Sequence, residues 1–286
     1  MIDPKDCTII IPHLGESEES RYAIGECFQS LEETVPDIKK IIAYNGRKDN
    51  GEKGSLFSPA DYINIKAQGQ CKAVNAAVAT TNTPWIFVTN DDMVYAPGWW
   101  EKLVGGELGI GLNPDVPTCI SPQLVEPRQG APTFIEYFCG GAGGDFDKQK
   151  WLEYVKEHGE NQDIFKGIRT GFNLPFLIKR ELWDTIGGYD INYDPWGSNS
   201  DSDLEYKIKL AGVQPYQNTN CLVYHFSQTS GTFEPRNQSH WQKNWDYFIE
   251  KWGFPRTDDG IWEATFEIPI SKLKYRPEWI NKYANS

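Results

Sequence analysis

The apolar positions in the first third of the chain repeat with two different periods. Short β-branched runs predict strands, whereas apolar residues three or four positions apart predict amphipathic helices. The predicted strands are Cys7–Ile11, Lys40–Tyr44, Tyr62–Ile65 and Trp85–Thr89, and the predicted helices are Ser20–Leu31, Gln70–Ala79 and one that begins near Pro97. Pro12 is expected to end the first strand. This alternation favours an α/β fold with a mainly parallel central sheet flanked by helices.

The rest of the chain continues the pattern after an irregular segment. Residues 113–144 are rich in Pro and Gly. Strands are predicted near Thr118–Ser121 and Thr133–Phe138 and at Phe176–Lys179 and Leu222–Tyr224, a turn at Gly140–Gly144, and helices at Trp151–His158, Arg180–Ile186, Asp203–Leu210 and Trp241–Trp252. No linker separates these elements, so we expect one domain over residues 1–254. Residues 255–286 are expected to form a C-terminal extension that packs on the core.

The net charge of the chain limits the classes of partner that it can bind. Lys and Arg number 28 and Asp and Glu number 40, which gives a net charge of -12. Because nucleic acids attract basic surfaces, this balance argues against a nucleic-acid partner. A phosphorylated ligand would need local neutralisation, most simply by a divalent cation.

The chain has no apolar run of the roughly 20 residues that a membrane helix needs and no secretory pattern at its N-terminus. We therefore expect no integral membrane segment, a cytoplasmic location and six reduced, buried cysteines.

Three short segments directly follow predicted strands. They are Pro12–Leu14, Asn45–Gly46 and Asn90–Asp92. The carboxyl ends of parallel strands meet at one edge of a sheet, where ligands bind. Carboxylates there are suited to hold Mg²⁺ or Mn²⁺. A polar turn with local hydrogen bonds is the alternative, and taken alone Asn-Asp-Asp favours that turn.

Two further positions carry candidate chemistry. The acidic segment from Trp196 to Glu205 leads into a helix, so Asp201 or Asp203 is either a general base or the helix N-cap. Taken alone, the pattern favours the cap. His225 directly follows a strand, where a histidine either completes local hydrogen bonds or binds a metal ion beside carboxylates.

The order of these segments resembles that of the family 2 glycosyltransferases, which have the GT-A fold. The matching segments are Ile9–Pro12, Asn75–Ala77, Trp85–Asp92, Phe176–Arg180, Ile186–Asp190, Trp196–Leu204, Gly212 and Lys251–Gly253. Together they cover residues 7–253, and residues 113–171 would be an insertion on the acceptor side. Each motif is degenerate, and their shared order and spacing makes the case.

The resemblance implies an inverting enzyme of the hexosyltransferase class. It would move a sugar from a nucleotide-diphosphate sugar, with a UDP-sugar favoured, to an acceptor hydroxyl on a glycan, using Mn²⁺ or Mg²⁺. Asp92, Asn90 and His225 would bind the metal, and Asp201, or Asp203 two residues on, would be the base. The nucleotide-sugar would contact Pro12, His13, Leu14, Tyr44, Asn45, Lys72, Asn90 and Asp91, and the acceptor would contact Trp196 and Tyr137.

Two other classes of protein share some of these features. A carbohydrate-binding module or pseudoenzyme would keep the aromatic and acidic residues without turnover. A nucleotidyltransferase also uses carboxylates at strand ends, but it needs a Gly-rich, basic loop after the first strand. Leu14–Glu19 is acidic instead, so the nucleotidyltransferase ranks third.

Overall fold

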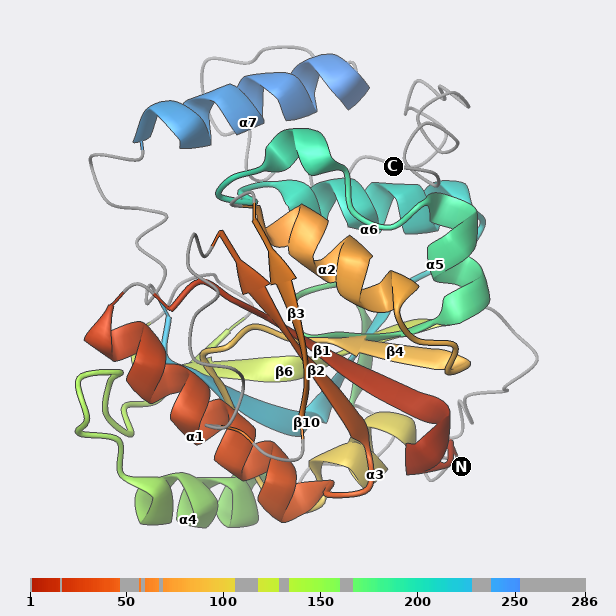
Figure 1. Ribbon diagram of the computed structural model, residues 1–286. Helices are drawn as coiled ribbons and strands as arrows, with labels where there is room; N and C mark the ends of the chain where they lie inside the picture. Colours follow the sequence, from red (N-terminus) through yellow and green to blue (C-terminus); the bar gives the residue numbers. More distant parts are fainter. Residues whose placement is uncertain are drawn as a thin grey trace.

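One sheet lies between two layers of helices in the computed structural model (Figure 1). The structure describes residues 2–15, 17–46, 57, 60–66, 69–105, 118–128, 134–159, 167–227 and 238–252. The strands are β1 Cys7–His13, β2 Lys39–Asn45, β3 Asp61–Ile65, β4 Trp85–Val88, β5 Met93–Tyr95, β6 Cys119–Glu126, β7 Ile135–Glu136, β8 Ile168–Thr170, β9 Phe176–Lys179 and β10 Tyr216–His225. The helices are α1 Glu18–Thr34, α2 Gln70–Ala79, α3 Trp99–Val104, α4 Lys148–Gly159, α5 Arg180–Ile186, α6 Ser200–Leu210 and α7 Gln238–Trp252. The predicted extension, residues 255–286, lies outside the described residues.

The strand order is β3-β2-β1-β4-β9-β6-β10-β5, with β7 beside β6 and β8 beside β10. Strands β1 to β4 pair in parallel, but β9 is antiparallel to both of its neighbours, β4 and β6. The predicted α/β fold with a central sheet flanked by helices is therefore confirmed. Parallel pairing dominates the half of the sheet built from the first third of the chain, and the other half is mixed.

The prediction that Pro12 ends the first strand is wrong. β1 continues to His13, and Pro12 stands opposite Ala43 of β2. The carbonyl of Ile10 faces β4, where it accepts a hydrogen bond from Thr89 N. Alternate residues face the same side, so the nitrogen of Pro12 also points towards β4. Because β4 pairs with β1 only as far as Ile10, the missing N–H of Pro12 removes no ladder bond.

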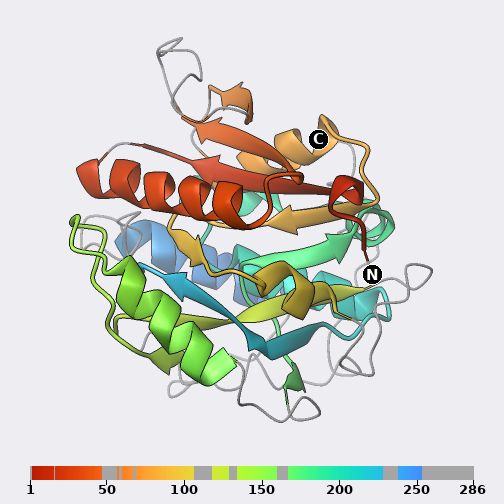
Figure 2. The ribbon, with the colours of Figure 1, turned by 90° about the horizontal axis from the view of Figure 1, so that it is seen from below.

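The two helical layers follow the apolar faces that the sequence predicts. Ser17 caps α1 by accepting from Ser20 N, and Glu18 and Glu19 favour the positive end of the helix dipole. With α3 and α4, α1 covers one face of the sheet, which Figure 2 views. Helices α2, α5 and α6 cover the other face, and α7 packs outside α6, where Phe248 stacks on Tyr206. All six cysteines are buried and unbridged. Over the part of the chain that the structure describes, no helix has the length and apolar character to cross a membrane.

Candidate active site

The carboxyl edge of the sheet brings Asp92, His225 and Glu126 together. Asp92 immediately precedes β5, and His225 at the end of β10 stands opposite Met93 of β5. Glu126 ends β6, the neighbour of β10 on its other side. The imidazole of His225 lies between the two carboxylates, with Nε2 3.3 Å from Asp92 Oδ2 and Nδ1 2.6 Å from Glu126 Oε1. Strand pairing thus unites residues that are far apart in sequence.

The charge state of His225 follows from this position. Burial alone would lower its pKa, but the carboxylates of Asp92 and Glu126 outweigh burial and raise the pKa to about 10. A divalent cation competes with that proton, because a metal ligand must be a neutral imidazole. Two ligands at right angles around an ion, each about 2.1 Å from it, stand about 3 Å apart. The separation of 3.3 Å between Nε2 and Oδ2 is close to that value.

A complete metal cage is not present among the residues described. No group of three or more His, Cys, Asp or Glu side chains there is arranged to hold an ion. Asn90, the third predicted ligand, accepts a hydrogen bond from Gln70 Nε2 at 3.2 Å through its amide oxygen. Mg²⁺ commonly takes one or two carboxylates, several waters and the substrate phosphates, so Asp92 and His225 fit an ion that the donor helps to coordinate.

The carboxylate of Asp91 contacts a different histidine from the carboxylate of Asp92. Its Oδ2 lies 2.5 Å from His13 Nδ1, which joins the turn after β4 to the end of β1. His13 is 4% exposed and meets the ring of Tyr44 edge-on. Burial raises the pKa of Asp91, although the contact with His13 opposes this shift. The nucleotide-side residues Pro12 and His13 are therefore buried, whereas Leu14 is partly exposed.

Of the other predicted nucleotide residues, Asn45 and Lys72 lie at the start of α2, whereas Tyr44 packs on the opposite face of the sheet. Tyr44 is buried in the core and stacks on Tyr62. Asn45 accepts a hydrogen bond from the backbone N–H of Gly69. The N–H groups of Cys71 and Lys72 both donate to the carboxylate of Asp194, at 2.9 and 3.1 Å. Asn45 and the first turn of α2 are thus tied together at the predicted site.

The structure separates the roles of Asp201 and Asp203. Helix α6 begins at Ser200, earlier than predicted, and Asn199 is its N-cap, so both aspartates lie in the first turn. Asp201 is partly exposed and accepts a 2.8 Å hydrogen bond from the hydroxyl of Tyr189. Burial raises the pKa of Asp201 to about 6, and the bond from Tyr189 limits this rise. A carboxylate with that pKa is suited to accept a proton near neutral pH.

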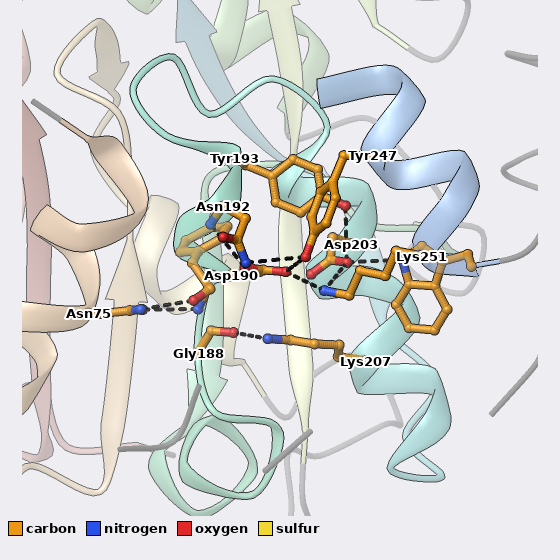
Figure 3. A network of polar contacts seen from close by, with 11 residues as sticks. Asn75, Gly188, Asp190, Asn192, Tyr193, Asp203, Lys207, Tyr247 and Lys251 are labelled. Carbon is orange, nitrogen blue, oxygen red and sulfur yellow. Dashed lines mark hydrogen bonds and ion pairs between the residues drawn. The ribbon is translucent and has the colours of Figure 1, made fainter. Parts of the chain in front are cut away.

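Asp203 belongs to a buried ionic network instead (Figure 3). It is fully buried, and its Oδ1 accepts from Trp252 Nε1 at 2.9 Å and from Lys251 Nζ at 2.7 Å. Lys251 also lies 2.7 Å from Asp190 Oδ2. Burial opposes the charge on Asp190, but Lys251 holds its pKa below the usual value. The network thereby fixes α7 to α6 and to the segment after α5.

The two predicted acceptor residues lie on different sides of the sheet. Trp196 is partly exposed beside α7, with its ring 6.3 Å from that of His240. Its buried indole N–H has no hydrogen-bond partner among the residues that the structure describes. Tyr137 follows β7 and stacks on Tyr154 of α4 at 4.0 Å between ring centroids. Helices α4 and α7 cover opposite faces, so the structure does not bring Trp196 and Tyr137 together (Figure 1).

Three residues at the site escaped the sequence analysis. Glu126 ends a strand at the carboxyl edge, as the identified residues do, but the predicted strand near Thr118–Ser121 stopped short of it. Tyr189 and Lys251 lie within segments that carried the family resemblance, yet no role was assigned to them. Their partners, Asp201 and Asp190, are remote from them in space until the helices pack.

Comparison with known proteins shows what the chain and its fold are similar to. Residues 8–106 match the model of the glycosyl transferase family 2. A protein from Leishmania donovani named "Galactofuranosyl glycosyltransferase" is 23% identical over 240 residues, which are 79% of this chain and 54% of that protein. The chain therefore spans about half the length of this curated relative.

Two solved structures have a similar fold. GalNAc-T7 with UDP, GalNAc and Mn²⁺ aligns with a TM-score of 0.56 and 16% identity, over 98% of this chain and 56% of that chain. The mannosyltransferase PcManGT from Pyrobaculum calidifontis, in complex with GDP-Man and Mn²⁺, aligns with a TM-score of 0.53 and 14% identity, over 100% of this chain and 75% of that chain. The fold is GT-A, and the resemblance to family 2 glycosyltransferases is confirmed.

Proposed function

We propose that this chain is an inverting glycosyltransferase that moves a sugar from a nucleotide-diphosphate sugar to a hydroxyl of a glycan acceptor. The observation that carries the proposal is the pairing of Asp92 with His225 at the carboxyl edge of a GT-A sheet. Neighbours of this fold were solved with Mn²⁺ and with UDP or GDP-Man. A UDP-sugar is the favoured donor.

In this proposal, the residues at the carboxyl edge of the sheet have different roles in binding the donor. Asp92 and His225 would hold Mn²⁺ or Mg²⁺, with Asn90 nearby, and the ion would stabilise the negative charge that grows on the departing diphosphate. Glu126 contacts the other imidazole nitrogen of His225 and so sets its orientation. Pro12–Leu14, Asn45 and Lys72 would line the nucleotide side, with Tyr44 and Asp91 supporting His13 from beneath.

Asp201 is the base in this proposal. As the acceptor oxygen bonds to the anomeric carbon, the bond from that carbon to the diphosphate breaks, and the acceptor proton passes to Asp201. Attack from the side opposite the leaving group inverts the anomeric centre. Asp203 is ion-paired with Lys251 and fully buried, so we assign it to holding α6 in place. Trp196, on the loop before α6, is the acceptor contact nearer to Asp201 in sequence.

A thermal-shift panel tests the proposal. UDP, GDP, CMP and their sugars are each added to the protein with Mn²⁺, Mg²⁺ or EDTA. A ligand at about 100 times its Kd adds about 2.7 kcal/mol of stability, so binding raises the Tm measurably. We expect one nucleotide diphosphate to raise the Tm only with metal, and Asp92→Asn to abolish that rise. The control Asp184→Asn changes an exposed carboxylate of α5 and should keep it.

The other outcomes are equally informative. Binding of a glycan with no response to any nucleotide would overturn the proposal in favour of a non-catalytic carbohydrate-binding module. A response to nucleoside triphosphates alone would favour a nucleotidyltransferase. A metal-independent response to UDP would remove Asp92 and His225 from the metal site.

A further inference from the structure

The hydroxyl of Tyr189 contacts the proposed base. Tyr189 is 1% exposed, and its hydroxyl donates to Asp201 Oδ1 at 2.8 Å. The ring packs in the core, edge-on to Trp183 and Phe176. Because the ring is enclosed, its hydroxyl has little freedom to move, and Asp201 receives a hydrogen bond from a fixed direction.

The backbone of Tyr189 is also held from α2. The side chain of Asn75 donates to Tyr189 O at 2.9 Å and accepts from Tyr189 N at 2.9 Å. This pair of bonds satisfies both backbone groups of one residue with a single side chain. Gly188 beside it has φ +61, and a Cβ there would stand 2.6 Å from Asn75 Oδ1, so glycine permits the close approach.

Buried lysines hold the residues on either side of Tyr189 (Figure 3). Lys207 of α6 donates to Gly188 O, and Lys251 of α7 pairs with Asp190. Both lysines are buried, and burying an ammonium group is costly unless it is paired and hydrogen-bonded. Residues 188 to 190 are therefore anchored to α2, α6 and α7 at once. Such support is what a precisely oriented catalytic group requires from its neighbours.

We propose that Tyr189 is a positioning residue that orients Asp201 towards the acceptor hydroxyl, and that Asn75, Lys207 and Lys251 keep Tyr189 in place. This inference rests on the proposed function, because it assumes that Asp201 is the base. It makes α7, the last described helix, a support for the chemistry through Asp190 and Tyr189.

The surroundings of Asp201 make this role measurable. Burial raises its pKa and the bond from Tyr189 lowers it, so loss of the hydroxyl raises the pKa further. Among the described residues, the thiol of Cys71 on α2 also interacts with Asp201, and burial raises the pKa of that thiol well above the ordinary value. Asp194 in turn accepts a hydrogen bond from Cys71 N at the start of α2. Asp203, on the same helix as Asp201, is paired with Lys251.

The test compares two tyrosine variants that each lose one hydroxyl. Tyr189→Phe removes the bond to Asp201, whereas Tyr193→Phe removes a 3.2 Å bond to Asp203. Transferase activity is measured against pH with the acceptor varied at saturating donor and metal, and the donor is varied in a separate series at pH 7. For Tyr189→Phe we expect kcat to fall about tenfold, the KM for the donor to stay unchanged, and the apparent pKa of kcat/KM for the acceptor to move from about 6 to about 7. For Tyr193→Phe we expect an unchanged profile and a lower Tm.

The outcomes separate this inference from the proposed function. Equal pH profiles for wild type and Tyr189→Phe, with wild-type activity present, would overturn the positioning role alone. Absence of transfer by the wild-type protein with every donor would overturn the proposed function itself. Should Tyr189→Phe melt too early to assay, a ¹³C NMR titration of the Asp201 carboxyl at low temperature still reads its pKa. An unshifted titration would then overturn the inference.

Discussion

The titration of Asp201 predicts how the activity depends on pH. Burial raises the pKa of Asp201 to about 6, so the base form is lost when the pH falls through that value. A group with a pKa of about 6 is roughly 90% ionised at pH 7 and roughly 10% ionised at pH 5. If only the ionised form accepts the proton, kcat/KM for the acceptor should fall about tenfold between pH 7 and pH 5.

The assay must isolate this group from the metal site. Initial rates of sugar transfer are measured from pH 4.5 to about 8.5 at saturating donor and Mn²⁺, so that proton competition at His225 does not limit the rate. Asp201→Asn should lose at least a hundredfold in kcat, within the range that general-base catalysis contributes, and should lose the acid limb of the profile. Asn keeps an oxygen that accepts from Tyr189, which preserves the local structure.

Stability gives an independent check with a defined sign. The folded-state pKa of Asp201 is above that of an unfolded aspartate, so the folded state holds the proton more tightly. The ionised carboxylate therefore destabilises the fold as the pH rises from about 4 to about 6. At pH 7, Asp201→Asn should melt no lower than the wild type while its activity is lost. A flat pH profile for the wild type between pH 5 and pH 7, or full activity of Asp201→Asn, would refute Asp201 as the base.

Two further predictions concern the buried charges. Lys251→Met leaves Asp190 and Asp203 buried without the lysine that pairs with them, so the free energy of unfolding from urea titration should fall by about 3–5 kcal/mol. The control Lys243→Met, on the exposed side of α7, should change it by less than about 0.5 kcal/mol. Similar losses in both variants would contradict the role of the network. Glu126→Gln should weaken Mn²⁺ binding by about 10–100-fold, because in the proposed site the Glu126 carboxylate orients His225. Calorimetry in the presence of UDP measures this affinity. The control Glu136→Gln changes an exposed residue on the paired strand β7 and should leave the affinity unchanged.

Local patterns predicted three elements with their observed bounds, because each of these is encoded within a few residues, whereas β5 and β8 were not predicted. The helix at Gln70–Ala79, the strand at Phe176–Lys179 and the helix at Arg180–Ile186 have the predicted bounds. The spacing of apolar residues and the glycines at the end of α5 are sufficient to predict the bounds of these elements. Pro12 misled the analysis, because whether a proline ends a strand depends on which neighbour its nitrogen faces. The direction in which the nitrogen points is set by the pairing of β1 with its neighbours, which the residues of β1 alone do not reveal.

The sequence could suggest residues of the proposed site only where a single segment carries them. Asn90–Asp92 and Asp201 follow recognisable patterns, and the fold places them at the edge and on α6. The different contacts of Asp201 and Asp203 come from Tyr189, in the segment after α5, and from Lys251 of α7, which reach them only when both elements pack on α6. Glu126 becomes part of the site through the pairing of β6 with β10. Contacts of this range leave no periodic signal in the sequence.

The position of β9 determines when β4 gains its second neighbour during synthesis. β9 pairs with β4 on one side and with β6 on the other, and it is made long after β4. A nascent chain that ends near residue 106, where the family 2 match ends, presents β4 with one unpaired edge. Open edges of this kind recruit other strands and promote aggregation. The segment that carries the family signal is therefore only part of a folding unit, because the sheet also needs β9 at residues 176–179 and β10 at residues 216–225.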